Sequence, residues 1–240
     1  MKLSLFLVAS AVAFGFTFAA AEAQDAKAKA KKKAAPNPAY QAVQDAPGLP
    51  RVLLIGDSIS IGYTLAVRDE LKGKANVHRP ATNCGPTTRG VEMIDSWLAG
   101  GKWDVIHFNF GLHDLKYIDE QGKNTPPEKG HVQVSEADYE KNLEAIVAKM
   151  KATGVKLIFA TTTPVPPGAD ARIKNDERKY NDIARRVMQK HGVAIDDLCA
   201  FSEPRLAEIQ LPANVHFKPE GSKELGKQVA ASVVKVLDSK

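Results

Sequence analysis

The sequence predicts an α/β fold in which helices cover both faces of a parallel sheet. Five short apolar segments with strand character alternate with five segments of helical periodicity, which is the pattern of a parallel sheet. These elements lie in residues 51–240, a length that suits one domain with a substantial core. No internal repeat is evident along the chain.

The predicted strands are short apolar runs separated by turn residues and helical segments. The first breaks on Gly56, and the third runs into Gly111. The five strands are predicted at residues 51–55, 77–81, 103–110, 155–160 and 193–195.

The predicted helices show apolar residues on one side and recognisable ends. Ser135 begins a capping-box type start with Asp138, and Gly192 is a typical helix stop. The five helices are predicted at residues 59–72, 89–98, 135–150, 176–191 and 219–237.

Residues 1–23 have the features of a secretory signal peptide. Lys2 is followed by an uncharged stretch from Leu3 to Ala21, and Ala21-Glu22-Ala23 is a small-x-small cleavage site. An uncleaved membrane anchor is the alternative, because the stretch is close to spanning length. Cleavage is favoured, so we expect a secreted or periplasmic protein without stable membrane insertion.

Residues 24–50 are rich in Lys, Ala and Pro, and we expect them to form a disordered tether. They hold five Lys against two Asp, a net charge of +3, while Lys2 and Glu22 cancel. Of the formal charge of +5, only +2 therefore belongs to residues 51–240. The basic character describes the tail and gives no reason to expect nucleic-acid binding.

Ser58 is the candidate nucleophile, because it follows Gly56 and Asp57 where the first strand turns into a helix. There, its backbone N–H points toward the group that it attacks, and the helix N-terminus favours developing negative charge. The alternative is a serine that only caps the helix. A serine hydroxyl needs a base, and the natural candidate is His216 near the C-terminus.

Four short motifs in this order resemble the GDSL-type (SGNH) hydrolase superfamily. They are Gly-Asp-Ser-Ile-Ser at residues 56–60, Asn-Cys-Gly at 83–85, Gly-Leu-His-Asp at 111–114, and His216. The resemblance covers nearly all of residues 51–240. It implies a flavodoxin-like three-layer sandwich with strand order 2-1-3-4-5, and a serine esterase that needs no cofactor.

Ser58, Gly85 and His113 are the expected oxyanion donors. Gly85 has no side chain, so its N–H could approach a ligand closely. The alternative interpretation is that Gly85 only forms a turn. The resembling family uses an asparagine where this chain has His113. A neutral imidazole can still donate one N–H, and no zinc-type spacing surrounds it, so we expect no metal.

The sequence does not identify the group that orients the ring of His216. The family usually has an aspartate three residues earlier, where this chain has Ala213. A backbone carbonyl in a Ser-His dyad, with help from Asn214, is favoured. One alternative is that a carboxylate from elsewhere in the chain orients His216, and the candidates are Asp196, Asp197 and Glu220. The other is that the protein has lost hydrolysis and kept binding.

Further residues are expected to support or line the site. Asp57 and Asp114 follow glycines at strand ends and are interpreted as hydrogen-bonding supports. The irregular segment 116–134 leaves the third strand where ligands bind in open α/β sheets, so it is expected to form a substrate-facing rim. Residues 161–167 and Arg172 are also expected to line the pocket.

The strand order that the resemblance implies bears on the two cysteines. It places Cys84 and Cys199 near opposite edges of the sheet, about four strand spacings of ~4.8 Å apart. A disulfide cannot span that distance, so two free thiols are expected.

The sequence thus predicts an exported carboxylic-ester hydrolase that forms an acyl-enzyme on Ser58. By family analogy, its substrate is a small ester or an acylated carbohydrate with acetyl groups. The alternatives are a non-catalytic carbohydrate-binding protein with this fold, and a lipase or thioesterase of the same family. The oligomeric state is left open.

Overall fold

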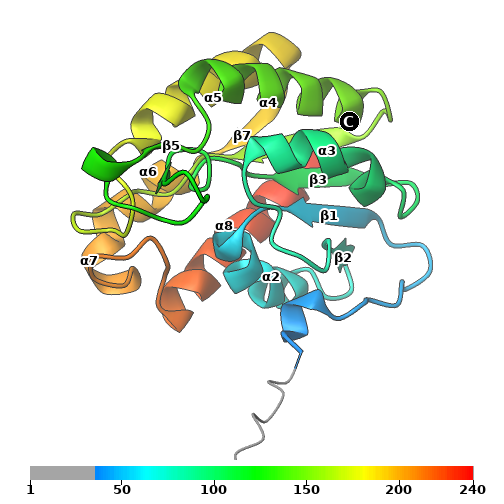
Figure 1. The fold of residues 1–240 in the computed structure, drawn as a ribbon. Helices are drawn as coiled ribbons and strands as arrows, with labels where there is room; N and C mark the ends of the chain where they lie inside the picture. The colour runs from blue at the N-terminus through cyan, green and yellow to red at the C-terminus, as the bar shows by residue number, and fades with distance from the viewer. Residues whose placement is uncertain (1–35, 240) are drawn as a thin grey trace, which may run out of the picture. The chain divides into compact units, whose positions relative to one another are not determined.

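A computed structural model describes residues 36–239, in which a central sheet lies between two layers of helices (Figure 1). All five strands of this sheet are parallel, in the order β2-β1-β3-β6-β7. Counted along the chain this is 2-1-3-4-5, so the predicted fold is confirmed. The strands are β1 (Arg51–Ile55), β2 (Asn76–His78), β3 (Val105–Phe108), β6 (Lys156–Ala160) and β7 (Ala194–Asp196).

The helices form two layers, one on each face of the sheet. Two helices pack together on one face, and three pack side by side on the other (Figure 1). The first layer is α2 (Ser58–Glu70) and α8 (Pro219–Asp238); the second is α3 (Thr87–Leu98), α4 (Glu136–Lys151) and α5 (Glu177–His191). Because both faces are covered, β3 is buried along its whole length.

The ends of the long helices follow the predicted signals. At the start of α4, Ser135 Oγ accepts the backbone N–H of Asp138 at 3.1 Å. At the end of α5, Gly192 has a φ of +64°, the left-handed conformation that glycine adopts without strain. All five predicted helices are present, with ends within about two residues of the predicted ones.

A run of short helices that the sequence analysis did not predict connects β7 to α8. It consists of α6 (Leu198–Ser202), η3 (Glu203–Arg205) and α7 (Leu206–Ile209). These helices have one turn or little more, so the hydrophobic pattern is too brief to reveal them. They carry the chain to the loop that contains His216.

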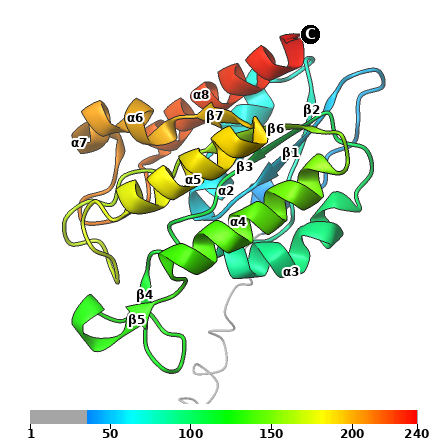
Figure 2. The same ribbon diagram turned by 90° about the horizontal axis from the view of Figure 1, so that it is seen from above.

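The predicted rim segment contains a small hairpin beside the C-terminal end of β3. Strands β4 (Tyr117–Ile118) and β5 (His131–Val132) pair antiparallel, with η2 (Pro127–Lys129) between them. Figure 2 shows this hairpin projecting from the body of the domain near the start of α4. Tyr117 N–H donates to Ala171 O at 2.8 Å, which ties the hairpin to the loop after β6.

Residues 37–50, which the sequence predicts as part of a tether, pack against the sheet domain. The compact unit extends over Asn37–Lys240. Ala39, in η1 (Pro38–Tyr40), is buried, and Asn76 donates to the carbonyls of Ala46 and Leu49. These long-range polar contacts hold a segment whose composition alone suggests a tether.

The predicted signal peptide and the tether residues before 36 lie outside the described residues. Among the residues that the structure describes, no helix combines the length and apolar character needed to cross a membrane. Cys84 is a buried free thiol, and Cys199 is a half-buried one.

Candidate active site

Ser58 and His216 meet at the C-terminal edge of the sheet. Ser58 is the first residue of α2, immediately after the turn that ends β1. His216 lies in the loop before α8, where its carbonyl accepts the N–H of Leu211 at 3.0 Å. The distance from Ser58 Oγ to His216 Nε2 is 2.8 Å, within the range of a hydrogen bond between a nucleophile and its base.

Asn214 fixes the ring of His216. Its Oδ1 lies 2.7 Å from His216 Nδ1 and accepts the backbone N–H of His216 at 3.0 Å. A backbone N–H only donates, so the amide must present its oxygen, and Nδ1 must carry the proton. His216 Nε2 is then unprotonated and accepts the Ser58 hydroxyl proton. This is the tautomer that a general base requires.

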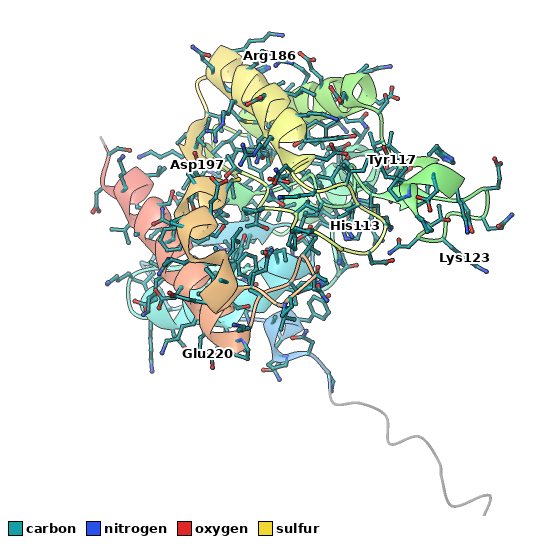
Figure 3. All side chains as sticks on the ribbon, turned by 90° about the vertical axis from the view of Figure 1, so that its left-hand side faces the viewer. His113, Tyr117, Lys123, Arg186, Asp197 and Glu220 are labelled. Carbon is teal, nitrogen blue, oxygen red and sulfur yellow. The ribbon has the colours of Figure 1, made fainter. Side chains whose placement is uncertain are left out.

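The partner that the structure gives His216 differs from the favoured dyad. A side-chain amide faces Nδ1, and the three candidate carboxylates lie elsewhere. Asp196 accepts His107 Nε2 at 3.1 Å, and Asp197 accepts Thr161 Oγ1 at 2.8 Å and pairs with Arg185. Figure 3 shows Asp197 and Glu220 apart from His113, which lines the same cavity as His216.

Ala213 occupies the position where the family usually has an aspartate, and its backbone is strained. Its φ is +51°, in the left-handed region that non-glycine residues rarely adopt. It lies at the tip of the turn between Leu211 and His216, directly before Asn214. Strain of this kind often accompanies functional geometry, and here it precedes the residue that orients the base.

The turn that presents Ser58 is held by Asp57 and needs a glycine at position 56. Asp57 is buried, and its Oδ1 accepts the N–H of Ile59 at 2.9 Å. A Cβ on Gly56 would lie 2.7 Å from Ser60 Cβ, so a larger residue would displace the first turn of α2. Asp57 thus acts as a structural support that caps the helix.

Arg79 joins this turn to the loop that contains Gly85. Its Nη2 donates to the carbonyls of Gly56 and Thr82, both at 3.3 Å. Its Nη1 donates to Ser60 Oγ at 3.2 Å and to Thr64 Oγ1 at 2.9 Å. Sequence analysis missed this residue, because nothing in its local pattern shows that one guanidinium connects two loops.

The structure does not bring Gly85 into the cavity as a free donor. Its N–H donates to Asn83 Oδ1 at 2.9 Å, and Asn83, not Gly85, lines the cavity. Gly85 has a φ of +68°, which explains why this turn requires a glycine. Asn83, which sequence analysis assigned no role, therefore replaces Gly85 as the cavity residue contributed by this loop.

His113 lies in the loop after β3, near the hairpin residue Tyr117 in Figure 3, and it is a half-buried residue of the cavity that Ser58 also lines. Burial lowers the pKa of His113, and the charges of Lys116 and Arg172 lower it further, while Asp57 opposes them. The imidazole is therefore neutral at pH 7 and can donate one N–H.

Asp114 anchors the loop of His113 to the start of α3. It is fully buried, and its Oδ1 accepts both the N–H of Thr87 at 2.8 Å and the Thr87 hydroxyl at 2.5 Å. Asn142 Nδ2 donates to the same hydroxyl oxygen at 3.1 Å. Burial raises the pKa of Asp114 to about 7, although the bonds from Thr87 lower it. Asp114 is a structural support between two loops of the site.

The cavity around Ser58 and His216 is polar and has a volume of about 390 Å³. Arg172 lines it, as expected, but residues 161–167 do not. Thr161 to Thr163 are buried in the core, and Pro164 to Pro167 line a neighbouring, more apolar cavity of about 300 Å³. The full lining is Asp57, Ser58, Asn83, Leu112, His113, Lys116, Asn124, Asp170, Arg172, Ala213, Asn214, Val215 and His216.

A larger cavity of about 690 Å³ lies at the other end of the strands, next to Pro50, Asp104 and Lys156. These residues immediately precede or begin β1, β3 and β6, so this cavity is remote from the serine. Between residues 36 and 239, no three His, Cys, Asp or Glu side chains are grouped as metal ligands would be.

The doubly covered parallel sheet defines an α/β fold, and Ser58 and His216 lie as a nucleophile and its base would lie. The profile of the GDSL-like lipase/acylhydrolase family matches residues 54–223. The chain therefore belongs to this family and is a hydrolase that acts on carboxylic esters.

Solved structures with the same fold include several esterases of low sequence identity. The acetyl xylan esterase AlAXEase is 16% identical, with a TM-score of 0.62 over 76% of this chain and 99% of that one. A lipase/acylhydrolase from Enterococcus faecalis is 20% identical, with a TM-score of 0.60 over 77% and 95%. Axe2, an acetylxylan esterase from Geobacillus stearothermophilus, is 15% identical, with a TM-score of 0.60 over 80% and 95%. No curated protein matches the chain.

Proposed function

We propose that the protein hydrolyses small acyl esters, chiefly acetyl esters of carbohydrates, through an acyl-enzyme on Ser58. The observation that carries this proposal is the 2.8 Å contact from Ser58 Oγ to His216 Nε2, with Asn214 Oδ1 on the other ring nitrogen. The polar lining of the cavity favours a polar leaving group such as a sugar. The acetyl xylan esterases of similar fold support the acetyl assignment as an analogy.

Acylation begins when Ser58 Oγ attacks the ester carbonyl carbon and His216 Nε2 takes the hydroxyl proton. The tetrahedral oxyanion receives the N–H of Ser58 at the start of α2 and the N–H of His113. The C–O bond to the alcohol then breaks, and His216 returns the proton to the departing alkoxide. The Nδ1–H bond to Asn214 keeps the ring oriented throughout.

Deacylation repeats these steps with water in place of Ser58. His216 takes a proton from the water, the hydroxide attacks the acyl carbon, and the proton passes to Ser58 Oγ as the acid leaves. Gly85 N–H joins the oxyanion site only if it leaves Asn83 Oδ1, so Ser58 and His113 are assigned as the principal donors.

Acetate release from 4-nitrophenyl acetate and acetylated xylan tests the proposal, with wild type compared with Ser58→Ala. We expect Ser58→Ala to lose hydrolysis of both esters. Equal rates in the two proteins would refute the nucleophile. Retained xylan binding without hydrolysis in wild type would instead favour the carbohydrate-binding alternative.

A lipase or thioesterase activity is the second candidate, favoured by the apolar cavity next to the site. That cavity has a volume of about 300 Å³, is lined by Pro164 to Pro167, and shares Ala213 with the catalytic cavity. A series of 4-nitrophenyl esters distinguishes the two. Highest kcat/KM for acetate supports the acetylesterase, and a maximum at six carbons or more supports the lipase.

We also propose that the enzyme acts outside the cytoplasm, because residues 1–23 have the pattern of a signal peptide. Intact mass of the protein from the culture medium or periplasm tests this location. A chain that starts at Gln24 is expected. A full-length protein that sediments with membranes would support the anchor alternative.

A further inference from the structure

The catalytic cavity has a basic corner that the proposed hydrolysis does not use. It is formed by Lys116, just before β4, by Arg172, in the loop after β6, and by Asn124 in the hairpin. Both cationic side chains are half-buried and line the same cavity as Ser58 and His216. We call these three residues the basic corner.

Hydrogen bonds hold Arg172 in place. Its Nε and Nη2 donate to Leu112 O at 3.0 and 2.8 Å, and its Nη1 donates to Asp170 O at 3.0 Å. A guanidinium has five N–H donors, and within the described residues these bonds use three of them. Two N–H groups of a fixed cation are therefore free to meet a ligand.

A hydrogen bond to the side-chain oxygen of Asn124 holds Lys116 in place. Its Nζ donates to Asn124 Oδ1 at 3.1 Å, and Asn124 Nδ2 donates to Asp170 Oδ2 at 2.8 Å. An ammonium has three N–H donors, so two of those on Lys116 have no acceptor in the part of the chain that the structure describes.

Burial disfavours the charged forms of both side chains, and Arg172 also repels the charge of Lys116. Burial lowers the pKa of Lys116, and the charge of Arg172 lowers it further, while Asp170 opposes this. Burial likewise lowers the pKa of Arg172, opposed by Asp57 and Asp170. An anion placed between two partly desolvated cations would relieve this repulsion and meet their free N–H groups.

The cavity has two acidic residues, and one of them, Asp170, lies beside the basic corner. Asp57 is buried and caps α2, and Asp170 is exposed and accepts the amide of Asn124. Because these two carboxylates balance Lys116 and Arg172 in formal charge, the cavity has no strong net field. We therefore expect recognition of an anion by direct contact and not by long-range attraction.

Resting on the proposed function, we propose that the basic corner binds a carboxylate on the sugar of the substrate, so that the preferred substrates are acyl esters of acidic, uronate-type sugars. A carboxylate has two acceptor oxygens, which suits two neighbouring cations with free N–H groups. The cavity volume of about 390 Å³ is within the range of sites that hold one small ligand.

A matched pair of substrates tests this proposal. One is an acetylated oligogalacturonide with free carboxylates, and the other is the same oligomer with its carboxylates converted to neutral amides. Acetate release from both gives two values of kcat/KM. We expect wild type to prefer the anionic oligomer about 10-fold, mainly through KM, because only the carboxylate accepts charge-assisted hydrogen bonds from Lys116 and Arg172. The preference should shrink as sodium chloride is raised.

Lys116→Gln is the informative variant, because Arg172 also supports the loop of His113 through Leu112. The ratio of the two kcat/KM values is expected to fall to about threefold or less. Lys123→Gln is the matched control, since Lys123 is an exposed lysine of the same hairpin that does not line the cavity (Figure 3). It should keep the wild-type ratio, as it removes the same charge farther from the site.

Equal kcat/KM for the two oligomers in wild type, or an unchanged ratio in Lys116→Gln, would overturn the basic corner as a carboxylate site. Either result leaves the esterase proposal intact as long as Ser58→Ala is inactive on both oligomers. Activity of Ser58→Ala equal to wild type would instead overturn the proposed function itself. Thermal unfolding of both lysine variants confirms that they are folded.

Discussion

Two histidines of this protein have polar partners in opposite surroundings. His107, on β3, is fully buried, and its Nε2 lies 3.1 Å from a carboxylate oxygen of Asp196. His216 is exposed, and its partners are the amide of Asn214 and the hydroxyl of Ser58. The kind of carboxylate that the resembling family usually has near its histidine is found here beside the buried His107.

Solvent access and a neighbouring nucleophile therefore decide the role of a histidine more than a carboxylate partner does. The second oxygen of Asp196 accepts Gln228 Nε2 at 2.9 Å, so the pair connects β3, β7 and α8 in the core. Among the described residues, His107 Nδ1 has no hydrogen-bond partner, and Tyr63 stands edge-on to its ring. We assign His107 and Asp196 to stability, and His216 and Asn214 to catalysis.

The largest effects are expected when the catalytic His216 and the stabilising Asp196 are replaced one at a time. His216→Ala should lower kcat by at least about 10⁴-fold, because the nucleophile and base act as a unit, with little change in stability. Asp196→Ala should lower the free energy of unfolding by about 1–3 kcal/mol, the usual cost of leaving a buried hydrogen-bonding group unsatisfied. Ester hydrolysis per folded molecule and urea unfolding measure the two quantities. Loss of activity in folded Asp196→Ala would contradict the separation.

Replacing Asn214 tests whether an amide is sufficient to orient the base. Asn214→Ala removes the acceptor of Nδ1–H, so kcat should fall by roughly 10²–10⁴-fold, as when a triad holds the wrong tautomer. Asn214→Asp keeps the oxygen and adds a charge that stabilises the imidazolium, so kcat should rise several-fold. The wild-type kcat in Asn214→Ala would mean that another group orients His216.

A third histidine, His113, is proposed to donate a hydrogen bond to the oxyanion. His113→Ala should lower kcat by about 10²–10³-fold with little change in KM, since the donated N–H matters in the transition state. His113→Asn restores a neutral donor and should stay within about tenfold of wild type. If both variants have equal kcat, His113 is not an oxyanion donor.

The smallest expected effect concerns Asp114, a buried carboxylate without a cationic partner. Burial raises its pKa from an ordinary value of 3.8 to about 7. Between these values the unfolded chain releases the proton while the folded protein keeps it, so stability falls as the pH rises from about 4 to 7. Asp114→Asn should flatten this part of the profile, measured by urea unfolding at several pH values. The wild-type slope in the variant would show that another group causes it.

The strands, the helices and the order of the sheet could be predicted because they depend on local apolar patterns and on a resemblance that spans the domain. Ser58, His113 and His216 were predicted in the same way, each at a strand end or before a helix, and the structure places them around one cavity. The unpredicted features depend on contacts between segments far apart in sequence. Residues 37–50 pack because Arg68 and Asn76 bind their carbonyls, and the two loops joined by Arg79 have no common sequence signal.

The Asn214 contact shows the limit of motif reading most clearly. The motif places an acceptor three residues before the histidine, and the chain has Ala213 there. Because Ala213 adopts a left-handed conformation at the tip of its turn, the residue two before the histidine faces Nδ1 instead. Asn214 was therefore predicted only as help for a backbone carbonyl, because spacing alone does not show which neighbour faces Nδ1.

Covalent labelling tests whether Ser58 is the activated nucleophile. Wild-type protein treated with a fluorophosphonate should gain one adduct in its intact mass, and peptide mapping should place that adduct on Ser58. His216→Ala should react far more slowly, and Ser58→Ala should not gain the adduct. A wild-type protein that remains unlabelled, or an adduct that persists in Ser58→Ala, would contradict the assignment of Ser58 as the activated nucleophile.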